Sequence, residues 1–279
     1  MSLDGTTANC DLEDYPANSN TPAAVTYNNG EVLACGGRDL EDADRCWRFD
    51  GSAWSPLPNS RQKHCFADSP SLIVSAGWWV TGTNGSCYGS STTSEVLTGE
   101  AWLPGPTLPA GVYSPYACVV NLNSTHTFHI GGIDTHHYPN PSNKAWLYNW
   151  ATEQWTETGP LRYGKYGHGC VNLGGTRGVL SLGGLDTSNY ASYSVQLYDP
   201  ARGAWSAQPD LPGGLLPYYP LLLNWEGQML ALFYGEDAIY RRSEETGEWS
   251  VLEGVQLPHT FLGYKNDKAV LVPNNFAHC

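Results

Sequence analysis

The chain is short of positive charge, of helical patterning and of long apolar runs. Its 279 residues include 14 Lys and Arg against 27 Asp and Glu, a formal net charge of −13. Nucleic acids and anionic membrane surfaces are bound by clustered Lys and Arg, so we expect neither as a partner. No apolar run approaches the roughly 20 residues that span a bilayer. No stretch of ten or more residues keeps apolar positions at helical spacing, so we expect almost no helix.

The first residues also lack the pattern of a secretory signal, because residues 1–4 (MSLD) have no basic start and no apolar core. Two other features favour an oxidising compartment all the same. The chain has eight cysteines, and it has glycosylation sequons at Asn84 and Asn123, both in predicted loops. We predict an extracellular protein that carries glycans on Asn84 and Asn123 and whose signal peptide is not in this sequence. A cytoplasmic location is the alternative.

Glycine, proline and aromatic side chains are abundant. The 31 Gly, 19 Pro and 12% aromatic residues, with only 15% charged residues, are typical of a turn-rich β protein. One alternating apolar run that stops at a diglycine recurs along the chain. Good copies are residues 32–37 (VLACGG), 126–132 (HTFHIGG) and 179–184 (VLSLGG), and worn copies are residues 72–77 (LIVSAG) and 229–235 (MLALFYG). Recurrence in a unit of about 50 residues predicts an array of similar supersecondary units.

Each diglycine strand lies inside a longer unit with a fixed order of features. A strand precedes it, a loop and a strand with an aromatic residue follow it, and a last strand with a Trp ends the unit, usually at Leu-Pro. These last strands carry Trp54, Trp102, Trp155, Trp205 and Trp249. The diglycine lets strands crowd together where a Cβ would clash, and Tyr and Trp fill the wider space between neighbouring sheets.

This order of features resembles the kelch repeat over nearly the whole chain. The resemblance implies a β-propeller, and first strands can be placed at residues 23–27, 64–68, 116–121, 167–172, 218–223 and 259–264. Six units in 279 residues give about 46 residues each, close to the kelch period. We predict one domain (residues 1–279): an all-β, six-bladed β-propeller of four-stranded antiparallel blades. Residues 8–13 supply the outer strand of the sixth blade, so the N- and C-terminal strands close the ring.

The predicted ring suggests partners for some cysteines. Cys10 and Cys279 would lie on adjacent outer strands of the sixth blade, and Cys35 and Cys46 could pair across a hairpin of the first. Cys87 is left with Cys65 or Cys118 as a possible partner, and Cys170 is interpreted as a buried thiol. No Cys-x-x-Cys pair and no Cys/His cluster has zinc spacing, so we expect no metal site and no cofactor.

In kelch propellers the loops between second and third strands share one face with the junctions between blades. The resemblance therefore places an aromatic, locally basic bowl on this face, suited to a protein or to an anionic or sugar-like ligand. The adjacent pair Trp78-Trp79 is predicted to lie in a loop of this face, with one ring exposed. The alternative is that the Arg and Tyr residues serve the repeat's own packing. The predicted ligand-binding residues are Arg61, Lys63, Trp78, Trp79, Tyr113, His136, His137, Tyr138, Arg162, Tyr163, Lys165, Tyr218 and His259.

We predict a binding module more readily than an enzyme. A carbohydrate-active enzyme similar to the six-bladed kelch sugar epimerases is the first alternative, with His168 or His259 paired with a carboxylate. No motif places such a carboxylate, and no nucleophile elbow or phosphate-binding glycine loop is present. A cytosolic adaptor that captures an acidic peptide is the second alternative. The sequence leaves the oligomeric state open.

Overall fold

The computed structural model describes residues 16, 23–27, 31–36, 43–61, 71–75, 78–82, 94–98, 101–109, 116–133, 140–225 and 227–256. These residues form twenty strands, and no helix that could cross a membrane occurs among them. The first ten strands are β1 (Ala23–Tyr27), β2 (Glu31–Cys35), β3 (Cys46–Phe49), β4 (Trp54–Pro56), β5 (Ser71–Ser75), β6 (Trp78–Gly82), β7 (Ser94–Thr98), β8 (Ala101–Pro104), β9 (Cys118–Asn123) and β10 (His126–Ile130). The other ten are β11 (Ala145–Asn149), β12 (Gln154–Glu157), β13 (Gly169–Asn172), β14 (Val179–Leu182), β15 (Val195–Asp199), β16 (Ala204–Gln208), β17 (Leu216–Trp225), β18 (Gln228–Tyr234), β19 (Ala238–Arg242) and β20 (Trp249–Gln256).

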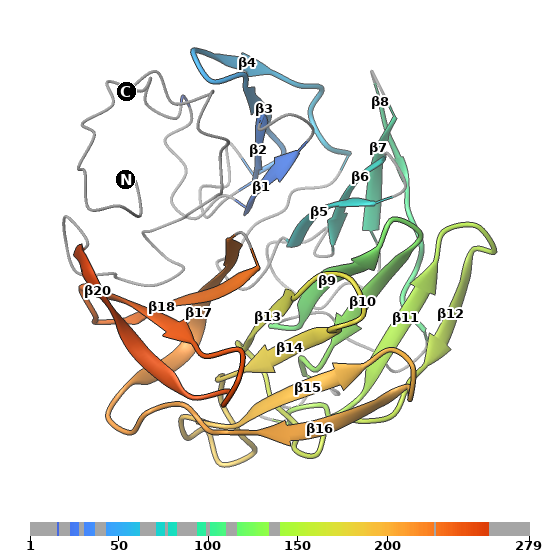
Figure 1. The fold of residues 1–279 in the computed structure, drawn as a ribbon. Coiled ribbons are helices and arrows are strands. Elements are labelled where there is room, and N and C mark those ends of the chain that lie inside the picture. Colours follow the sequence, from blue (N-terminus) through green and yellow to red (C-terminus); the bar gives the residue numbers. More distant parts are fainter. Residues whose placement is uncertain are drawn as a thin grey trace.

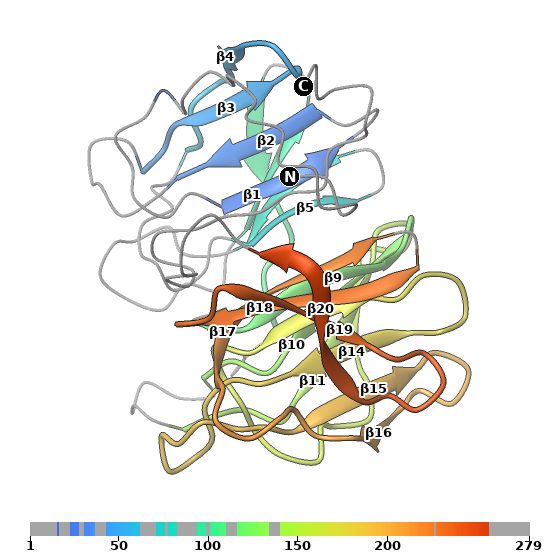
Figure 2. The same cartoon turned by 60° about the vertical axis from the view of Figure 1, so that its left-hand side comes forward.

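Every four consecutive strands form one antiparallel sheet, and the sheets are arranged around a common centre as in a β-propeller (Figure 1). The strands β1, β5, β9, β13 and β17 lie innermost, and each packs against the next. Figure 2 shows the first sheet with β1, β2 and β3 side by side. The predicted all-β propeller is therefore present. The described residues make five sheets, not the predicted six, and the sixth would draw on residues 8–13 and 257–279, outside the described residues.

Four of the predicted first strands match β1, β9, β13 and β17, but the second sheet was predicted wrongly. The sequence predicts a second strand at residues 72–77, whereas β5 is the first strand of its sheet and pairs with β6. Trp78 and Trp79 consequently lie in the second strand, β6, and not in a loop. The predicted first strands at residues 64–68 and 259–264 lie outside the described residues.

Hydrogen bonds join two of the Trp strands to the turn that ends the preceding sheet. The indole Nε1 of Trp102 donates to the Pro58 carbonyl at 2.8 Å, in the turn of the preceding sheet. Trp155 donates in the same way to the Thr107 carbonyl at 2.9 Å. In both cases the buried or half-buried indole N–H finds a carbonyl partner that a turn exposes, so the Trp joins two sheets as well as filling the space between them.

The diglycine allows the segment that leads into the next sheet to pack closely against it. Gly131 and Gly132 have φ angles of 64° and 89°, which favour glycine. The Gly132 N–H donates to the Lys165 carbonyl at 3.0 Å. A Cβ on Gly131 would lie 2.7 Å from that same carbonyl oxygen and 2.7 Å from His168 Cε1. The sequence-based explanation, that glycine relieves crowding, is correct, and the crowding partner is the junction to the fourth sheet.

The core lies between the sheets. Phe128 and Tyr198, from the third and fourth sheets, pack with ring centroids 4.7 Å apart, and Trp205 covers both. Phe233 of the fifth sheet packs in a second cluster with side chains of the fourth sheet, such as Leu182. Large aromatic and aliphatic side chains between twisted sheets supply most of the favourable free energy of folding in such an architecture.

A line of asparagines joins the inner strands at the end where the first-to-second-strand turns lie. Asn172 Nδ2 donates to the carbonyls of Asn121 and Leu122, each at 2.8 Å, in the preceding sheet. Asn224 Nδ2 donates in turn to the Asn172 carbonyl at 2.9 Å. The three asparagines hold equivalent positions, because they pair with Thr127, Val179 and Met229 at the start of each second strand. We call Asn121, Asn172 and Asn224 the asparagine line.

Two disulfides involve described cysteines. Cys35 and Cys46 are bonded across β2 and β3, with Cα atoms 4.1 Å apart, as predicted. Cys118 and Cys170 are bonded between β9 and β13, with Cα atoms 5.9 Å apart. The latter corrects two predictions, since Cys170 is not a free thiol and Cys118 is not the partner of Cys87. The pairing of Cys10 with Cys279 lies outside the described residues and stays a prediction.

Candidate functional site

The junctions enter the third, fourth and fifth sheets through three residues with left-handed backbone. Tyr116, Gly167 and Tyr219 have φ angles of 61°, 60° and 53°. The Gly167 N–H donates to the Tyr116 carbonyl at 2.8 Å, and the Tyr219 N–H donates to the Gly167 carbonyl at 2.6 Å. A non-glycine residue in this region is strained by about 1 kcal/mol or more and often marks a functional position. Two tyrosines are held this way at equivalent points around the centre.

The rings of these tyrosines belong to a row that we call the tyrosine arc. Its neighbouring ring centroids lie 5.5, 6.1, 6.1 and 5.6 Å apart, which is the range of aromatic contact. In order, its members are Tyr166, Tyr116, Tyr219, Tyr218 and Tyr234. The arc therefore crosses from the third sheet to the fifth on the face where the junctions lie.

The arc has a buried end and an open end. Tyr166 is fully buried, and its hydroxyl donates to Asn189 Oδ1. Tyr116, Tyr218 and Tyr219 are half-buried, and Tyr234 is 37% exposed. Burial, followed by the nearby Tyr234, raises the pKa of Tyr218, so its hydroxyl is protonated and can donate at neutral pH.

Glycine at position 167 is required by the arc itself. A Cβ there would come within 2.6 Å of Tyr219 Cε1, so the Tyr219 ring rests directly against the Gly167 backbone. Together with the left-handed φ angle, this contact leaves no room for another residue. The arc is thus part of the packed structure and is ordered before any ligand binds.

Sequence reasoning placed Tyr218 in the site but missed Tyr234. A signal for Tyr234 exists. Thr127 and Met229 hold equivalent positions in their strands, so Phe233 and Tyr234 stand where the third sheet has its diglycine. A bulky aromatic at a position reserved for glycine elsewhere is a departure from the repeat that calls for a separate explanation.

The backbones of the predicted residues Arg61 and Arg162 take part in contacts between sheets. The Arg162 N–H donates to Gln196 Oε1 at 2.7 Å, and the Arg61 N–H donates to Glu95 Oε1 at 3.1 Å. Both acceptors come from the third strand of the following sheet, so the repeat fixes the arginine backbone and supports the packing alternative there. Both arginine residues are nevertheless exposed. The Arg162 guanidinium carbon lies 5.3 Å from the ring centroid of Tyr163, which is 53% exposed.

Lys165 does not lie on the bowl surface. It is fully buried, and its Nζ donates to the Ser194 carbonyl at 3.2 Å. Burial lowers the pKa of its amine to about 7, and Asp210 opposes the shift. The amine of Lys165, which we expected to contact a ligand, therefore lies in the protein interior. The basic character of this face comes from its exposed arginines.

His168 and His129 form a neutral interior pair. Burial, followed by the charges of Lys165 and His129, lowers the pKa of His168 well below its usual value. Burial lowers the pKa of His129 to about 4. No ring nitrogen of either histidine has a hydrogen-bond partner among the described residues. Among the described residues, therefore, none supplies His168 with the carboxylate partner that the enzyme alternative requires.

The remaining predicted residues contribute less. The Asp186 carboxylate, in the loop between β14 and β15, accepts the Ser188 and Tyr190 N–H groups at 2.8 and 3.0 Å and thus stabilises a turn. Within the part of the chain that the structure describes, no three His, Cys, Asp or Glu residues are grouped to hold a metal ion. Outside the described residues lie Lys63, Tyr113, His136, His137, Tyr138 and His259.

Comparison with known proteins identifies the architecture. No protein-family model matches the sequence, and no curated protein matches it. Among solved structures, one titled "Structure of YjhT" superposes with a TM-score of 0.71 at 12% sequence identity, covering 89% of this chain and 87% of that one. In all, 332 chains of solved structures match. At this level of identity the likeness shows the propeller fold alone, because many unrelated functions share a fold.

Proposed function

We propose that the protein is a secreted, six-bladed kelch-type propeller that binds a sugar-like ligand through the tyrosine arc. The single observation that carries the proposal is the arc itself, a row of five packed tyrosine rings that passes from full burial to partial exposure. A tyrosine ring offers an apolar face and a polar hydroxyl tip. A sugar ring is complementary to such a surface, because it presents C–H groups on its faces and hydroxyls at its edge.

Rigidity supports the same function. Tyr116 and Tyr219 are held by strained backbone, by hydrogen bonds through Gly167 and by ring contacts. The Cys118–Cys170 disulfide joins the inner strands β9 and β13 two residues beyond Tyr116 and three beyond Gly167. A surface ordered before binding avoids the entropic cost of ordering side chains in the complex.

Secretion is supported by two disulfides and by the geometry of one sequon. Asn123 is exposed at the end of β9, directly before the turn to β10. Its Oδ1 accepts the Thr125 N–H at 2.9 Å and the Thr125 hydroxyl at 3.0 Å. The acceptor amide is therefore accessible and ordered. Asn84 lies outside the described residues, and glycosylation at both positions remains a proposal.

The test is a screen of the purified protein against an array of oligosaccharides, followed by calorimetry with the best ligand. Tyr218→Ala and Tyr234→Ala remove two arc members and are expected to weaken binding about tenfold each, the loss typical of an aromatic anchor. Tyr190→Ala is the matched control, since Tyr190 is 72% exposed on the same face but outside the arc. Its affinity should stay within about twofold of the parent protein.

Three results would overturn the proposal. The first is an array without carbohydrate binding, and the second is an equal loss of affinity in Tyr190→Ala and Tyr218→Ala. The third is chemical conversion of a bound sugar or capture of an acidic peptide by the arc face. Conversion would favour the enzyme alternative, and peptide capture would favour the adaptor.

A further inference from the structure

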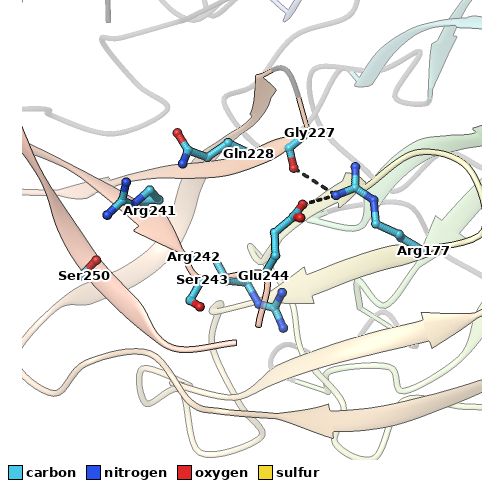
Figure 3. Close-up of a pocket in the computed structure, with 8 residues that line it drawn as sticks. All are labelled: Arg177, Gly227, Gln228, Arg241, Arg242, Ser243, Glu244 and Ser250. Atoms are coloured by element: carbon cyan, nitrogen blue, oxygen red, sulfur yellow. Dashed lines mark hydrogen bonds and ion pairs between the residues drawn. The ribbon is translucent and has the colours of Figure 1, made fainter. Parts of the chain in front are cut away.

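A concave surface lies at the ends of the strands opposite the tyrosine arc, between the fourth and fifth sheets. It is a cleft of about 520 Å³ built around the β13–β14, β17–β18 and β19–β20 turns (Figure 3). In Figure 3, Arg177 and Arg241 stand at its two ends with Gln228 and Glu244 between them. The residues that line it are Arg177, Gly227, Gln228, Arg241, Arg242, Ser243, Glu244 and Ser250.

The cleft has an excess of positive charge in an acidic protein. Three arginines and one glutamate line it, although the chain as a whole has a net charge of −13. Arginines gathered in a concavity concentrate anions there, because guanidinium groups present several donors in a fork that matches carboxylate, phosphate and sulfate oxygens. The local charge therefore favours an anionic ligand over a neutral one.

Two of the arginines have donors without a hydrogen-bond partner among the described residues. Arg242 is 9% exposed, and its Nη2 donates to Gln208 Oε1 at 2.9 Å. Its buried Nε has no hydrogen-bond partner among the described residues. Arg241 is exposed, and the structure records no hydrogen bond or ion pair of its guanidinium with any described residue. A buried donor without a partner destabilises the fold, and an anion bound nearby would offset part of that cost.

The third arginine is held by the protein itself. Arg177 donates to the Gly227 carbonyl at 3.1 Å and to the Leu173 carbonyl, and it forms an ion pair with Glu244. The Arg177 and Glu244 side chains are 42% and 65% exposed, so water and salt weaken their attraction. Glu244 thus acts as an internal competitor that a stronger anion can displace.

We propose that this cleft is a binding site for a phosphate or sulfate group, separate from the tyrosine arc. Arg241, with the Ser250 hydroxyl and the Gln228 amide on the same side of the cleft, provides the entry contacts. Arg242 points to the other face of the strand and adds its positive charge at longer range, and displacement of Glu244 frees Arg177 at the opposite end of the cleft. The proposal does not depend on the proposed sugar site, because it concerns other residues at the other end of the strands.

The test is calorimetry with inorganic phosphate and inorganic sulfate, at an ionic strength held constant with potassium chloride. Arg241→Gln removes the guanidinium that has no recorded partner among the described residues, and it is expected to lower the affinity for phosphate about tenfold. Glu244→Gln removes the carboxylate that competes for Arg177, and it is expected to raise the affinity for phosphate several-fold. Opposite changes from two exposed positions cannot arise from unfolding, which would weaken binding in both.

Two controls sharpen the result. Arg202→Gln changes an exposed arginine in the β15–β16 turn, where it pairs with Asp199, outside the cleft, and phosphate affinity should not change. Tyr218→Ala should also leave phosphate binding intact. Absence of any phosphate or sulfate effect beyond that of chloride would overturn the proposal, as would equal losses in Arg202→Gln and Arg241→Gln. A sulfated disaccharide that binds more tightly than free sulfate would identify an ester as the source of the anion, and equal affinities would identify the free ion.

Discussion

Replacement of Lys165 by Met is expected to stabilise the protein, and more at neutral pH than at alkaline pH. The amine is fully buried, and burial lowers its pKa from 10.5 to about 7. Between these values the unfolded chain binds more protons than the folded protein does, so the free energy of unfolding rises with pH across this window. The linkage relation gives a loss of about 4 kcal/mol at neutral pH and about 2 kcal/mol near pH 9.

Lys165→Met keeps the apolar stem and removes the ammonium. It also removes the hydrogen bond to the Ser194 carbonyl, which is 3.2 Å long, at a cost of about 1 kcal/mol. The net expectation is a gain of about 3 kcal/mol at neutral pH that falls to about 1 kcal/mol near pH 9.

Urea unfolding followed by tryptophan fluorescence measures both values, without reductant so that the disulfides stay intact. Arg202→Met is the control, because this exposed arginine should change the free energy of unfolding by less than about 0.5 kcal/mol at either pH. The reasoning is refuted if Lys165→Met has the same effect at both pH values. It is also refuted if the variant loses several kcal/mol at neutral pH, since the ammonium would then have partners that repay its burial.

Two further changes test how the sheets are joined. Asn172→Ala removes two hydrogen bonds to the preceding sheet, to the Asn121 and Leu122 carbonyls, and should lower the free energy of unfolding by about 2 kcal/mol in urea unfolding; a change below about 0.5 kcal/mol would contradict the asparagine line. Joint replacement of Cys118 and Cys170 by Ser opens a loop with a sequence separation of 52, and the chain-entropy relation gives a loss of about 4 kcal/mol. The thermal midpoint measures this loss, and an unchanged midpoint would show that neighbouring contacts already fix the two strands.

The repeat made most of the fold predictable, and its failure in the second sheet has a physical cause. Trp54, Trp155 and Trp205 lie in fourth strands as expected, because a large ring at a constant place in each unit fills the same intersheet space. First and second strands both carry runs of apolar residues and therefore look alike in the sequence. In the second sheet no diglycine marks the end of the second strand, so the sequence predicts a second strand where β5 lies and a loop at Trp78 and Trp79.

The candidate site was less predictable because its residues depend on packing between units. Nothing in the sequence around Lys165 distinguishes a buried amine from an exposed one, and only the junction geometry encloses it. The Cys118–Cys170 pair did have a signal. The two cysteines are about one repeat apart, and residues one repeat apart in first strands lie on neighbouring inner strands.

The inner strands of the third, fourth and fifth sheets are hydrogen-bonded to one another at both ends. One set of bonds is the asparagine line, and the other runs through the backbone of Tyr116, Gly167 and Tyr219. A local opening of one sheet breaks neither set, because both bridge adjacent sheets. The Gly167 and Tyr219 amides should therefore exchange with deuterium only when these sheets separate, and their exchange rate is a direct measure of how often that separation occurs.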